Sequence, residues 1–229
     1  MAADLTPSAT ASAPDRIRDP SFATTLAHGF QILAAFRGGA TSLSNGELAT
    51  LTGLSRPTVS RLTYTLASLG YLRRGERGRF EVGLGVLAAA YPLLASQKIR
   101  QLARPLMRDY ANFSGGTVSL TMPFGLDHIY IETVRTADVI PHTPEIGFTA
   151  PMAKTAAGRA LLSLYDEAEI AAYIAAIRTE RPEWENLLRE ATLPGIAQCR
   201  RDGFALSPAD WRPEILGVAA PIPRTPNGD

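Results

Sequence analysis

The chain has 229 residues, of which 45% are hydrophobic and 20% are charged, and its 23 Lys and Arg residues nearly balance its 22 Asp and Glu residues. This composition is typical of a soluble globular protein of one or two domains. The single Cys199 excludes an internal disulfide framework, and the Ala, Ser, Thr and Pro-rich start lacks the apolar core of a signal peptide. No apolar stretch reaches the roughly 20 residues that a membrane span needs, so we expect a cytoplasmic protein.

Charge is distributed unevenly along the chain. Residues 1–80 contain nine arginines and five acidic residues, a net charge of +4, whereas the remainder carries 14 basic and 17 acidic residues, a net charge of −3. A basic first part joined to an acidic second part is expected when only the first part binds a polyanion such as DNA. A random fluctuation would give the same charges, so the charge distribution alone does not distinguish DNA binding from chance.

The character of the chain changes at residue 21. Residues 1–20 hold three prolines and many small polar residues but almost no large apolar side chains, so we expect a flexible tail. From residue 21 onward apolar residues recur at spacings of three and four, which predicts an amphipathic helix that ends at Gly38 and Gly39. The residues of this pattern are Phe22, Leu26, Phe30, Leu33 and Phe36.

Two further helices are predicted by their capping residues. Ser44 and Glu47 have the spacing of a capping box, which predicts a short helix that ends before Gly53. Ser55 can cap a third helix, and Pro57 lies in its first turn, where a missing N–H costs little.

The third helix, which we expect to end at Gly70, has two different faces. At 100° per residue one side is apolar and the other is polar and carries arginine. The apolar side holds Val59, Leu62, Leu66 and Leu69, and the polar side holds Pro57, Ser60, Arg61 and Tyr64, flanked by Arg56. A helix, a short helix, a tight glycine-containing turn and such a third helix constitute a helix-turn-helix.

A hairpin is predicted directly after the third helix. Residues 71–73 and 79–82 are short strand-like segments, and they are joined by a glycine-containing turn. Arginines lie at and beside this turn, which gives the hairpin a basic tip: Arg73, Arg74, Arg77 and Arg79. Residues 21–83 are therefore expected to form a winged helix-turn-helix DNA-binding domain.

The second half of the chain alternates between helical and strand-like patterns. Residues 84–113 are predicted as linker helices, in which Pro105 either kinks the second helix or begins it. The later elements are expected as strands at 118–122 and 129–134 joined by a turn at 123–127, a loop at 141–151, helices at 154–164, 167–177 and 184–201, and strands at 204–206 and 216–220. Residues 114–229 are thus expected to form a mixed α/β domain, and the whole chain belongs to the α+β class.

The order of these parts, together with several local strings, resembles the IclR family of bacterial transcription regulators. The helix-turn-helix string at residues 48–62 and the string Leu69-Gly70-Tyr71-Leu72 at the start of the wing are similar to the family's pattern. Further similar strings follow in order: Ala103-Arg104-Pro105, Gly116-Thr117-Val118, residues 157–162 with Arg159 in place of the family's Lys, Asp202-Gly203-Phe204-Ala205 and residues 217–221. The resemblance covers about residues 22 to 222.

The resemblance implies an N-terminal winged helix-turn-helix, a linker helix, and a C-terminal GAF-like α/β effector domain that binds small organic acids or aromatic compounds. It also implies dimers or dimers of dimers. Family chains usually continue past the strand at 217–221 with another strand and a helix, whereas this chain ends at Asp229. We therefore expect the effector domain, residues 114–229, either to be truncated or to lack elements that are dispensable. A second departure is Met152-Ala153-Lys154-Thr155, where the family often has Met-His before the Ser or Thr.

The DNA-binding residues are expected on the third helix and the wing. Arg and Ser are mostly exposed in any protein, so a solvated helix face is the competing interpretation. The cap, the turn and the basic wing together favour DNA binding. A helix N-terminus suits phosphate oxygens, and exposed Arg, Ser and Tyr side chains suit base edges in the major groove. The expected set is Ser55, Arg56, Pro57, Thr58, Ser60, Arg61, Tyr64, Arg74 and Arg77.

The effector site is expected where the loop that precedes Thr155 enters a helix. Such a helix start offers N–H groups to an anion, although a simple N-cap role for Thr155 explains the residue equally well. The resemblance implies that the matching loop and helix start line a pocket, with Gly217 leaving room for a larger ligand; Trp211 fits a pocket wall, the core or an interface. The implied set is Gly147, Thr155, Ala156, Ala157, Ser207, Trp211 and Gly217.

An enzyme is disfavoured, because three histidines and one cysteine leave little material for a catalytic triad or a metal site. His28 falls in the first helix and His128 in the expected hairpin turn, and the sequence has no Walker loop and no G-x-G-x-x-G motif. We expect no cofactor. The sequence thus predicts a regulator that binds a pseudo-palindromic DNA operator as a dimer or tetramer and senses a small organic, aromatic carboxylate. The alternative is a small-molecule sensor or dimerisation protein without specific DNA binding.

Overall fold

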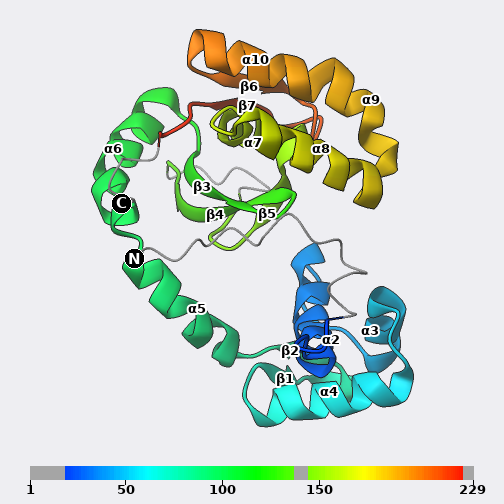
Figure 1. Ribbon diagram of the computed structural model, residues 1–229. Coiled ribbons are helices and arrows are strands. Elements are labelled where there is room, and N and C mark those ends of the chain that lie inside the picture. Colours follow the sequence, from blue (N-terminus) through cyan, green and yellow to red (C-terminus); the bar gives the residue numbers. More distant parts are fainter. Residues whose placement is uncertain (1–18, 137–143, 224–229) are drawn as a thin grey trace. The chain divides into compact units, whose positions relative to one another are not determined.

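The computed structural model describes residues 19–136 and 144–223 (Figure 1). The chain divides into two compact units, of which one reaches to Gln97 and the other begins at Lys98. Nearly all of the expected tail at 1–20, part of the expected loop at 141–151, and residues 224–229 lie outside the described residues. The boundary falls inside the expected linker, so its two helices belong to different units.

The first helix that the structure describes, α2 (Thr24–Ala34), continues as a 3₁₀ turn to Gly38. Its periodicity predicts the helix, but the apolar side chains used for that prediction do not all face the core. Phe22, Leu26 and Phe30 are exposed, the last two by 61% and 62%. Of the predicted residues, Phe36 is buried and Leu33 packs against the core. Ile32, which the predicted pattern did not include, is fully buried, so the buried side of α2 is turned toward Ile32.

Helices α3 (Asn45–Thr52) and α4 (Arg56–Ser68) are joined by a tight turn at Gly53, whose φ of 68° favours glycine. This confirms both predicted helices. Val59 is buried as predicted, but Leu69 is exposed, because α4 ends at Ser68 and Leu69 lies beyond the packed face.

The predicted wing is present as β1 (Leu72–Arg74) paired antiparallel with β2 (Phe80–Val82), with a 3₁₀ turn at Glu76–Gly78. Phe80 also exchanges two backbone hydrogen bonds with Leu43, at 2.7 and 2.8 Å, which ties the wing to the segment before α3. At the base of the wing a Cβ on Gly83 would lie 2.2 Å from the Gly70 carbonyl oxygen, so only glycine allows the two backbones this close.

The linker segment forms α5 (Leu84–Ser96) in the first unit and α6 (Lys98–Ser114) in the second. Pro105 neither begins α6 nor ends it, since the helix runs through this position. Met107 and Ala111 pack one face of α6 against the sheet of the second unit. The opposite face is apolar and exposed along its whole length: Ile99, Leu102, Leu106, Tyr110 and Phe113.

The sheet of the second unit has the strand order β3-β4-β5 and is antiparallel throughout. Its strands are β3 (Val118–Phe124), β4 (Asp127–Val134) and β5 (Thr149–Pro151). Two details differ from the sequence prediction. The turn at 123–127 is shorter, because Pro123 lies in β3, an edge strand where its missing N–H is tolerated. Strand β5 lies within a segment that was predicted as loop.

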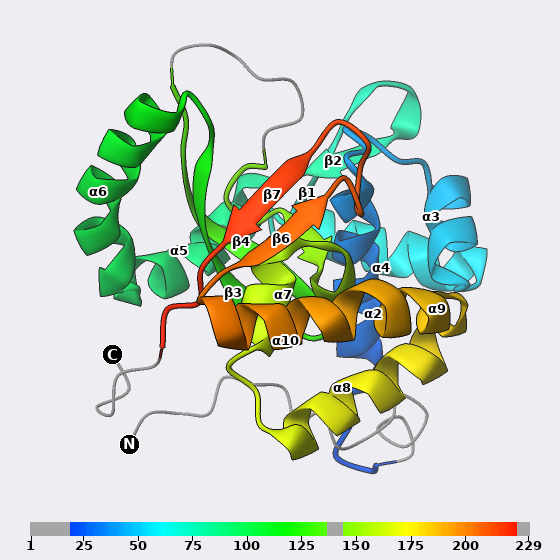
Figure 2. The same cartoon turned by 90° about the horizontal axis from the view of Figure 1, so that it is seen from above.

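Helix α7 (Ala156–Leu162) contacts the hairpin of β6 (Ala205–Pro208) and β7 (Leu216–Ala219) (Figure 2). The helix predicted at 154–164 thus begins two residues later, because Thr155 is its N-cap. Helix α8 (Glu167–Glu180) follows, and α9 (Glu185–Leu187) leads through a π-helical segment into α10 (Leu193–Asp202). Pro194, which has no N–H to donate, lies just after that segment.

The core of the second unit lies between α7, α8 and the segment of α9 and α10, and it is made of large apolar side chains. Its largest fully buried side chains are those of Met152, Leu162, Ile177 and Leu188. The expected α+β class is confirmed, with the helix-turn-helix in the first unit and a mixed helix and sheet domain in the second. In the part of the chain that the structure describes, no helix combines the length and apolarity that crossing a membrane requires.

Candidate functional site

The N-terminus of α4 is organised by Ser55. Its hydroxyl accepts a hydrogen bond from the Thr58 amide at 3.3 Å and lies 2.8 Å from the Thr58 hydroxyl. Pro57 occupies the first turn, as its sequence position predicts. The start of α4 is therefore rigid and solvent-facing, with a positive helix-dipole end.

The predicted DNA-binding residues share one property, which is exposure. All of them are exposed except Thr58, which is half-buried, and the Tyr64 ring is 65% exposed. The buried side of the same helix is fixed by Val59 and by Thr63, whose hydroxyl lies 3.0 Å from Asn45 Oδ1 in α3. Packing on one side thus presents the polar side to solvent.

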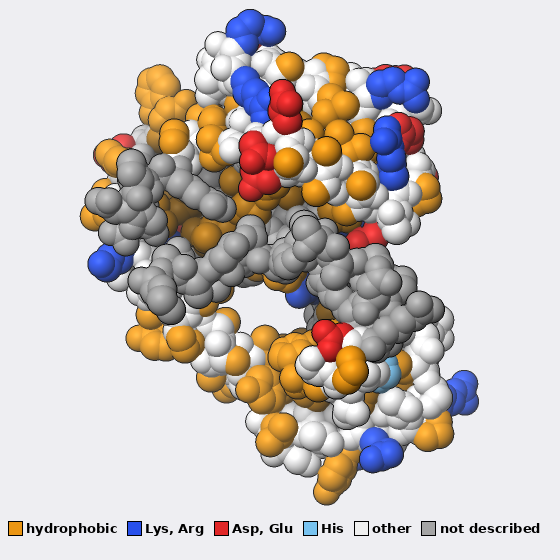
Figure 3. Space-filling model, in the orientation of Figure 1, with side chains coloured by type: hydrophobic (Ala, Val, Ile, Leu, Met, Phe, Trp, Pro, Cys, Tyr) orange, Lys and Arg blue, Asp and Glu red, His pale blue; other side chains and the backbone are white. Residues whose placement is uncertain are grey.

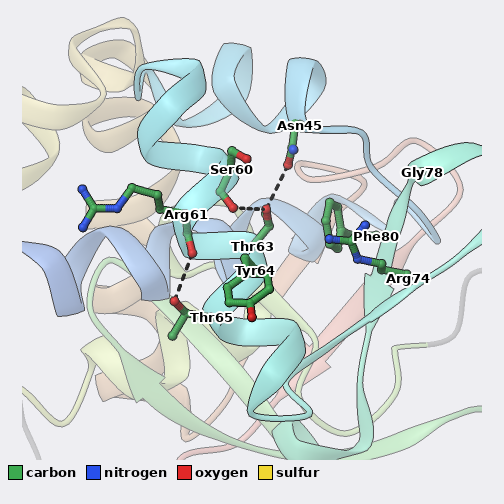
Figure 4. Close-up of a pocket in the computed structure, with 9 residues that line it drawn as sticks. All are labelled: Asn45, Ser60, Arg61, Thr63, Tyr64, Thr65, Arg74, Gly78 and Phe80. Carbon is green, nitrogen blue, oxygen red and sulfur yellow. Dashed lines mark hydrogen bonds between the residues drawn. The ribbon is translucent and has the colours of Figure 1, made fainter.

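A groove of about 530 Å³ runs between α4 and the wing (Figure 4). Arg61 and Tyr64 of α4 line it on one side, and Arg74 and Phe80 of the wing line it on the other. The guanidinium of Arg61 points away from the wing (Figure 4). Asn45 also lines the groove, and sequence reasoning missed it. Asn45 is the first residue of the short helix α3 and faces α4. This position at the start of the helix could have identified it as a candidate from the sequence.

The wing arginines divide into two kinds. Arg73 forms an ion pair with Glu81, and Arg79 forms one with Glu47 at 2.9 Å. Arg74 lies over the Phe80 ring at 5.7 Å, and Arg77 lies at the tip with a φ of 52°. Within the described residues, neither of these last two arginines pairs with a carboxylate, and the same holds for Arg56 and Arg61 on α4. In the described part of α4 and the wing, these four side chains therefore supply the positive charge that is not balanced by a carboxylate.

Arg79 holds the wing against the beginning of α3. Its guanidinium donates to the Ser42 hydroxyl and carbonyl, both at 2.9 Å, and to Glu47 Oε1 at 3.0 Å. Glu47 closes the capping box, because it accepts from the Ser44 amide at 2.7 Å. Hydrogen bonds from Ser44, followed by Arg79, lower the pKa of the Glu47 carboxyl to about 2. Arg79 is thus a structural clamp rather than a free cation.

In the second unit Thr155 is the N-cap of α7, with its hydroxyl accepting from the Gly158 amide at 3.1 Å. The same hydroxyl lies 3.0 Å from the Pro151 carbonyl oxygen and 2.9 Å from His128 Nε2. A Cβ on Gly158 would lie 2.1 Å from the Met152 Cα, so glycine allows the close approach on which this turn depends. Thr155 is buried, and its hydroxyl is fully engaged in holding the helix start.

Three of the other predicted effector residues meet beside α7. A Cβ on Gly217 would lie 3.3 Å from the Ala156 Cβ and 3.9 Å from the Ser207 Cβ. The buried Ser207 hydroxyl donates to the Lys154 carbonyl at 3.0 Å. The Trp211 ring packs at 5.8 Å on Phe148, which follows Gly147 in the chain.

His128 lies in β4 and is fully buried, so its predicted position in a hairpin turn is wrong. The turn is confined to residues 125 and 126, and the histidine therefore points into the core. Burial lowers the pKa of His128 to about 4, against a smaller opposing effect of Asp127, so the ring is neutral at pH 7. His128 begins a row of aromatic contacts that continues through Tyr130 and Phe148 to Trp211.

A buried arginine completes this region. Arg159 of α7 is 3% exposed, and its Nη2 forms an ion pair with Asp210 at 2.6 Å. Its Nη1 donates to the Leu206 carbonyl at 2.7 Å. The neighbouring cation, Lys154, lies over the Trp184 ring at 4.5 Å. Among the residues of known position, no three His, Cys, Asp or Glu side chains are grouped in a way that could hold a metal ion.

An exposed, arginine-bearing helix after a tight turn, a hairpin wing beside it, and a separate α/β unit define a winged-helix DNA-binding protein with a second domain. Two family models match the chain: the IclR helix-turn-helix domain over residues 25–76, and the bacterial transcriptional regulator IclR C-terminal domain over residues 92–225. The chain belongs to the IclR family of transcription regulators. The relatives of this chain are bacterial regulators with a helix-turn-helix DNA-binding domain and a ligand-binding C-terminal domain.

Individual relatives agree with this assignment. The chain is 31% identical over 189 residues to the HTH-type transcriptional regulator KipR of Bacillus subtilis, covering 79% of this chain and 73% of KipR. It is similar to the crystal structure of an IclR family regulator from Brucella abortus, with a TM-score of 0.81 and 32% identity, covering 95% of this chain and 83% of the other. An IclR homolog from Microbacterium hydrocarbonoxydans, complexed with 4-hydroxybenzoate, shares the fold at 19% identity and a TM-score of 0.69, covering 89% and 85%.

Proposed function

We propose that this protein is a ligand-responsive, non-enzymatic regulator in the cytoplasm that binds a pseudo-palindromic operator as a dimer or tetramer. The observation that carries the proposal is the groove between α4 and the wing, which is lined by Arg61 and Arg74. Among the residues that the structure describes, neither arginine has a carboxylate partner. Buried or paired arginines would fit a structural role, whereas exposed and unpaired ones suit a polyanion.

The predicted residues divide between two tasks. Ser55, Thr58 and the start of α4 suit phosphate oxygens, because the amide groups and helix dipole favour an anion there. The exposed residues further along the polar face suit base edges, where arginine pairs bidentately with guanine. This second set comprises Arg56, Ser60, Arg61 and Tyr64. Arg74 and Arg77 suit the backbone beside the recognition helix.

Two copies of the chain are needed for this task, since one short helix covers a single half-site. Three exposed apolar faces support self-association. They lie on α2 at Leu26 and Phe30, with Phe22 just before this helix, on α5 at Leu84, Leu87 and Tyr91, and on the exposed apolar face of α6. Figure 3 shows hydrophobic side chains along α5. Exposed apolar faces of this extent are typical of interfaces.

A small aromatic carboxylate is the proposed effector. The aromatic row that ends at Trp211 supports an apolar wall. The extra room expected at Gly217 is not found, because a Cβ there would lie 3.3 Å from the Ala156 Cβ. Gly147, Thr155 and Ala157 are also proposed to lie around the bound effector. The 4-hydroxybenzoate in the Microbacterium homolog is an acid of the same class, although that protein shares only the fold with this chain.

Binding to genomic DNA fragments tests the first part of the proposal. Purified protein is expected to shift a subset of fragments at moderate salt, and an Arg77→Ala variant should bind all of them more weakly with a log–log salt slope reduced by about 1. Failure to retain any fragment at low salt would favour the alternative, a small-molecule sensor or dimerisation protein without specific DNA binding.

A further inference from the structure

One ion pair balances the charge of a buried arginine in α7. Arg159 is buried between α7 and α10, where a Cβ on Gly195 would lie 2.7 Å from the Arg159 Cδ. Its guanidinium is surrounded by two carbonyl groups, those of Leu206 at 2.7 Å and Ala153 at 3.5 Å, which carry no net charge. Its Nε is buried without a hydrogen-bond partner. Within the described residues, the Asp210 carboxylate is the one anion paired with this cation.

Asp210 is more exposed to solvent than Arg159. Its side chain is 23% exposed, and it lies in the segment that connects β6 to β7. The hydrogen bonds within this segment are local, from the Ala209 amide to the Ser207 carbonyl and from the Ile215 amide to the Arg212 carbonyl. Ala209 has a φ of 66°, a conformation that costs a residue with a side chain about 1 kcal/mol or more. The segment is therefore held in a strained form by contacts outside itself.

Two such contacts are present: the ion pair of Asp210 with Arg159, and the packing of Trp211 on Phe148. The ion pair lies beside the meeting point of Ala156, Ser207 and Gly217, because Arg159 also donates to the carbonyl of Leu206, which precedes Ser207. Arg159 follows Ala156 by one turn of α7, so a ligand beside Ala156 would lie next to the guanidinium.

We propose that Arg159 is the residue that binds the effector carboxylate, and that Asp210 is a built-in competitor that occupies Arg159 until the effector displaces it. This inference rests on the proposed function of the second domain. A buried guanidinium left without an anion is strongly unfavourable, so a carboxylate can replace Asp210 whereas a neutral ligand cannot. The displaced Asp210 is partly exposed already and moves into water. Its departure frees the β6–β7 segment, including Trp211, and this is the conformational signal.

The inference predicts a specific response to substitution of the competitor. Asp210→Asn keeps a side chain of the same shape with an oxygen for Arg159, but it removes the competing charge. Affinity of the full-length protein for benzoate, measured by calorimetry, should rise about tenfold or more, because the binding-competent state is no longer suppressed. Benzamide, the neutral analogue, should not bind either protein. Asp202→Asn, which removes the exposed partner of Arg201, is the matched control and should leave benzoate affinity unchanged.

Two further measurements separate a role in binding from a role in folding. Arg159→Gln should lower benzoate affinity by at least about thirtyfold while DNA binding without acid is retained. In a Trp184→Phe background, Trp211 is the one remaining tryptophan, and its emission should change on addition of benzoate but not of benzamide. This fluorescence test needs no change at Arg159 or Asp210, so it holds even where those variants unfold.

The outcomes distinguish the inference from the proposed function. Benzoate binding with equal affinity to the wild type and Asp210→Asn, or binding that leaves Trp211 emission unchanged, would overturn the exchange while leaving an acid-sensing domain in place. A failure of benzoate and 4-hydroxybenzoate to bind the wild type and every variant would overturn both the exchange and the aromatic-acid effector.

Discussion

Arg61 and Arg73 are both exposed arginines of the winged-helix domain, yet in the described structure only Arg73 has a carboxylate partner, Glu81. Arg61 lines the groove between α4 and the wing, whereas Arg73 lies on the neighbouring strand with its charge compensated. The two residues therefore form a matched pair for separating a base-reading role from general positive charge.

Arg61→Ala is expected to weaken operator binding by about 1–3 kcal/mol, with the loss concentrated at one base pair of each half-site. Arg73→Ala should weaken it less and equally at all sequences, since exposed and paired charges contribute little. Fluorescence anisotropy with an operator and its single-base variants measures both. Equal losses for the two variants would contradict a base contact by Arg61.

His128 makes a second prediction at this scale. The unfolded chain binds a proton at this residue near pH 6.5, whereas burial in the folded protein lowers its pKa to about 4. His128 therefore has no effect on the pH dependence of the free energy of unfolding above pH 6.5. As the pH falls from 6.5 to 4, this residue lowers the free energy of unfolding by about 3 kcal/mol. In the His128→Gln variant, the glutamine side chain can still form a hydrogen bond with Thr155 but does not titrate. Urea unfolding should show that the variant loses about 3 kcal/mol less than the wild type over the same pH range. Identical pH profiles for the two proteins would refute the buried neutral histidine.

At the scale of elements, the structure shows which sequence signals act locally. The capping box of Ser44 and Glu47 and the turn at Gly53 involve neighbouring residues, so helices α3 and α4 could be predicted from the sequence. The exposure of the polar face of α4 could be predicted by the same reasoning. The burial of Ile32 rather than Leu26 could not be predicted, because both faces of α2 are apolar and only the packing partners decide between them.

The candidate effector site was less predictable for the same reason. The contact of His128 with Thr155 spans 27 residues, and that of Arg159 with the Leu206 carbonyl spans 47. Strand β5 consists of three residues, too few to show a period. Such contacts depend on the pairing of distant segments, which spacing in one sequence does not show.

The clamp formed by Arg79 between the wing and α3 is expected to affect DNA binding without touching DNA. Ser44→Ala removes the cap alone and should cost about 1 kcal/mol of stability. Glu47→Ala removes the cap partner and also releases Arg79, so it should lower operator affinity more than Ser44→Ala does. Thermal unfolding and anisotropy on both variants measure this difference. If the two variants bound DNA equally well, the wing position would not depend on the clamp.

At the scale of the whole molecule, the exposed apolar faces predict self-association. Leu26→Glu on α2 and Leu106→Glu on α6 each place a charge on such a face and should shift the protein toward monomers, because burying an unpaired charge is unfavourable. Gln31→Glu and Gln101→Glu, at exposed polar positions of the same helices, are the controls and should leave the assembly unchanged. Sedimentation velocity distinguishes the species. A wild-type protein that is monomeric at micromolar concentration would refute this prediction.

The most direct test of the central claim, that the chain is a DNA-binding regulator acting as a symmetric assembly, is a footprint on a fragment selected from genomic DNA. The account predicts two protected half-sites related by a two-fold axis, with centres about 34 Å or a multiple of that distance apart along the duplex. It also predicts at least two chains per fragment and loss of both half-sites together in Arg61→Ala. A single asymmetric site occupied by one chain, or the absence of any protected fragment, would contradict the account.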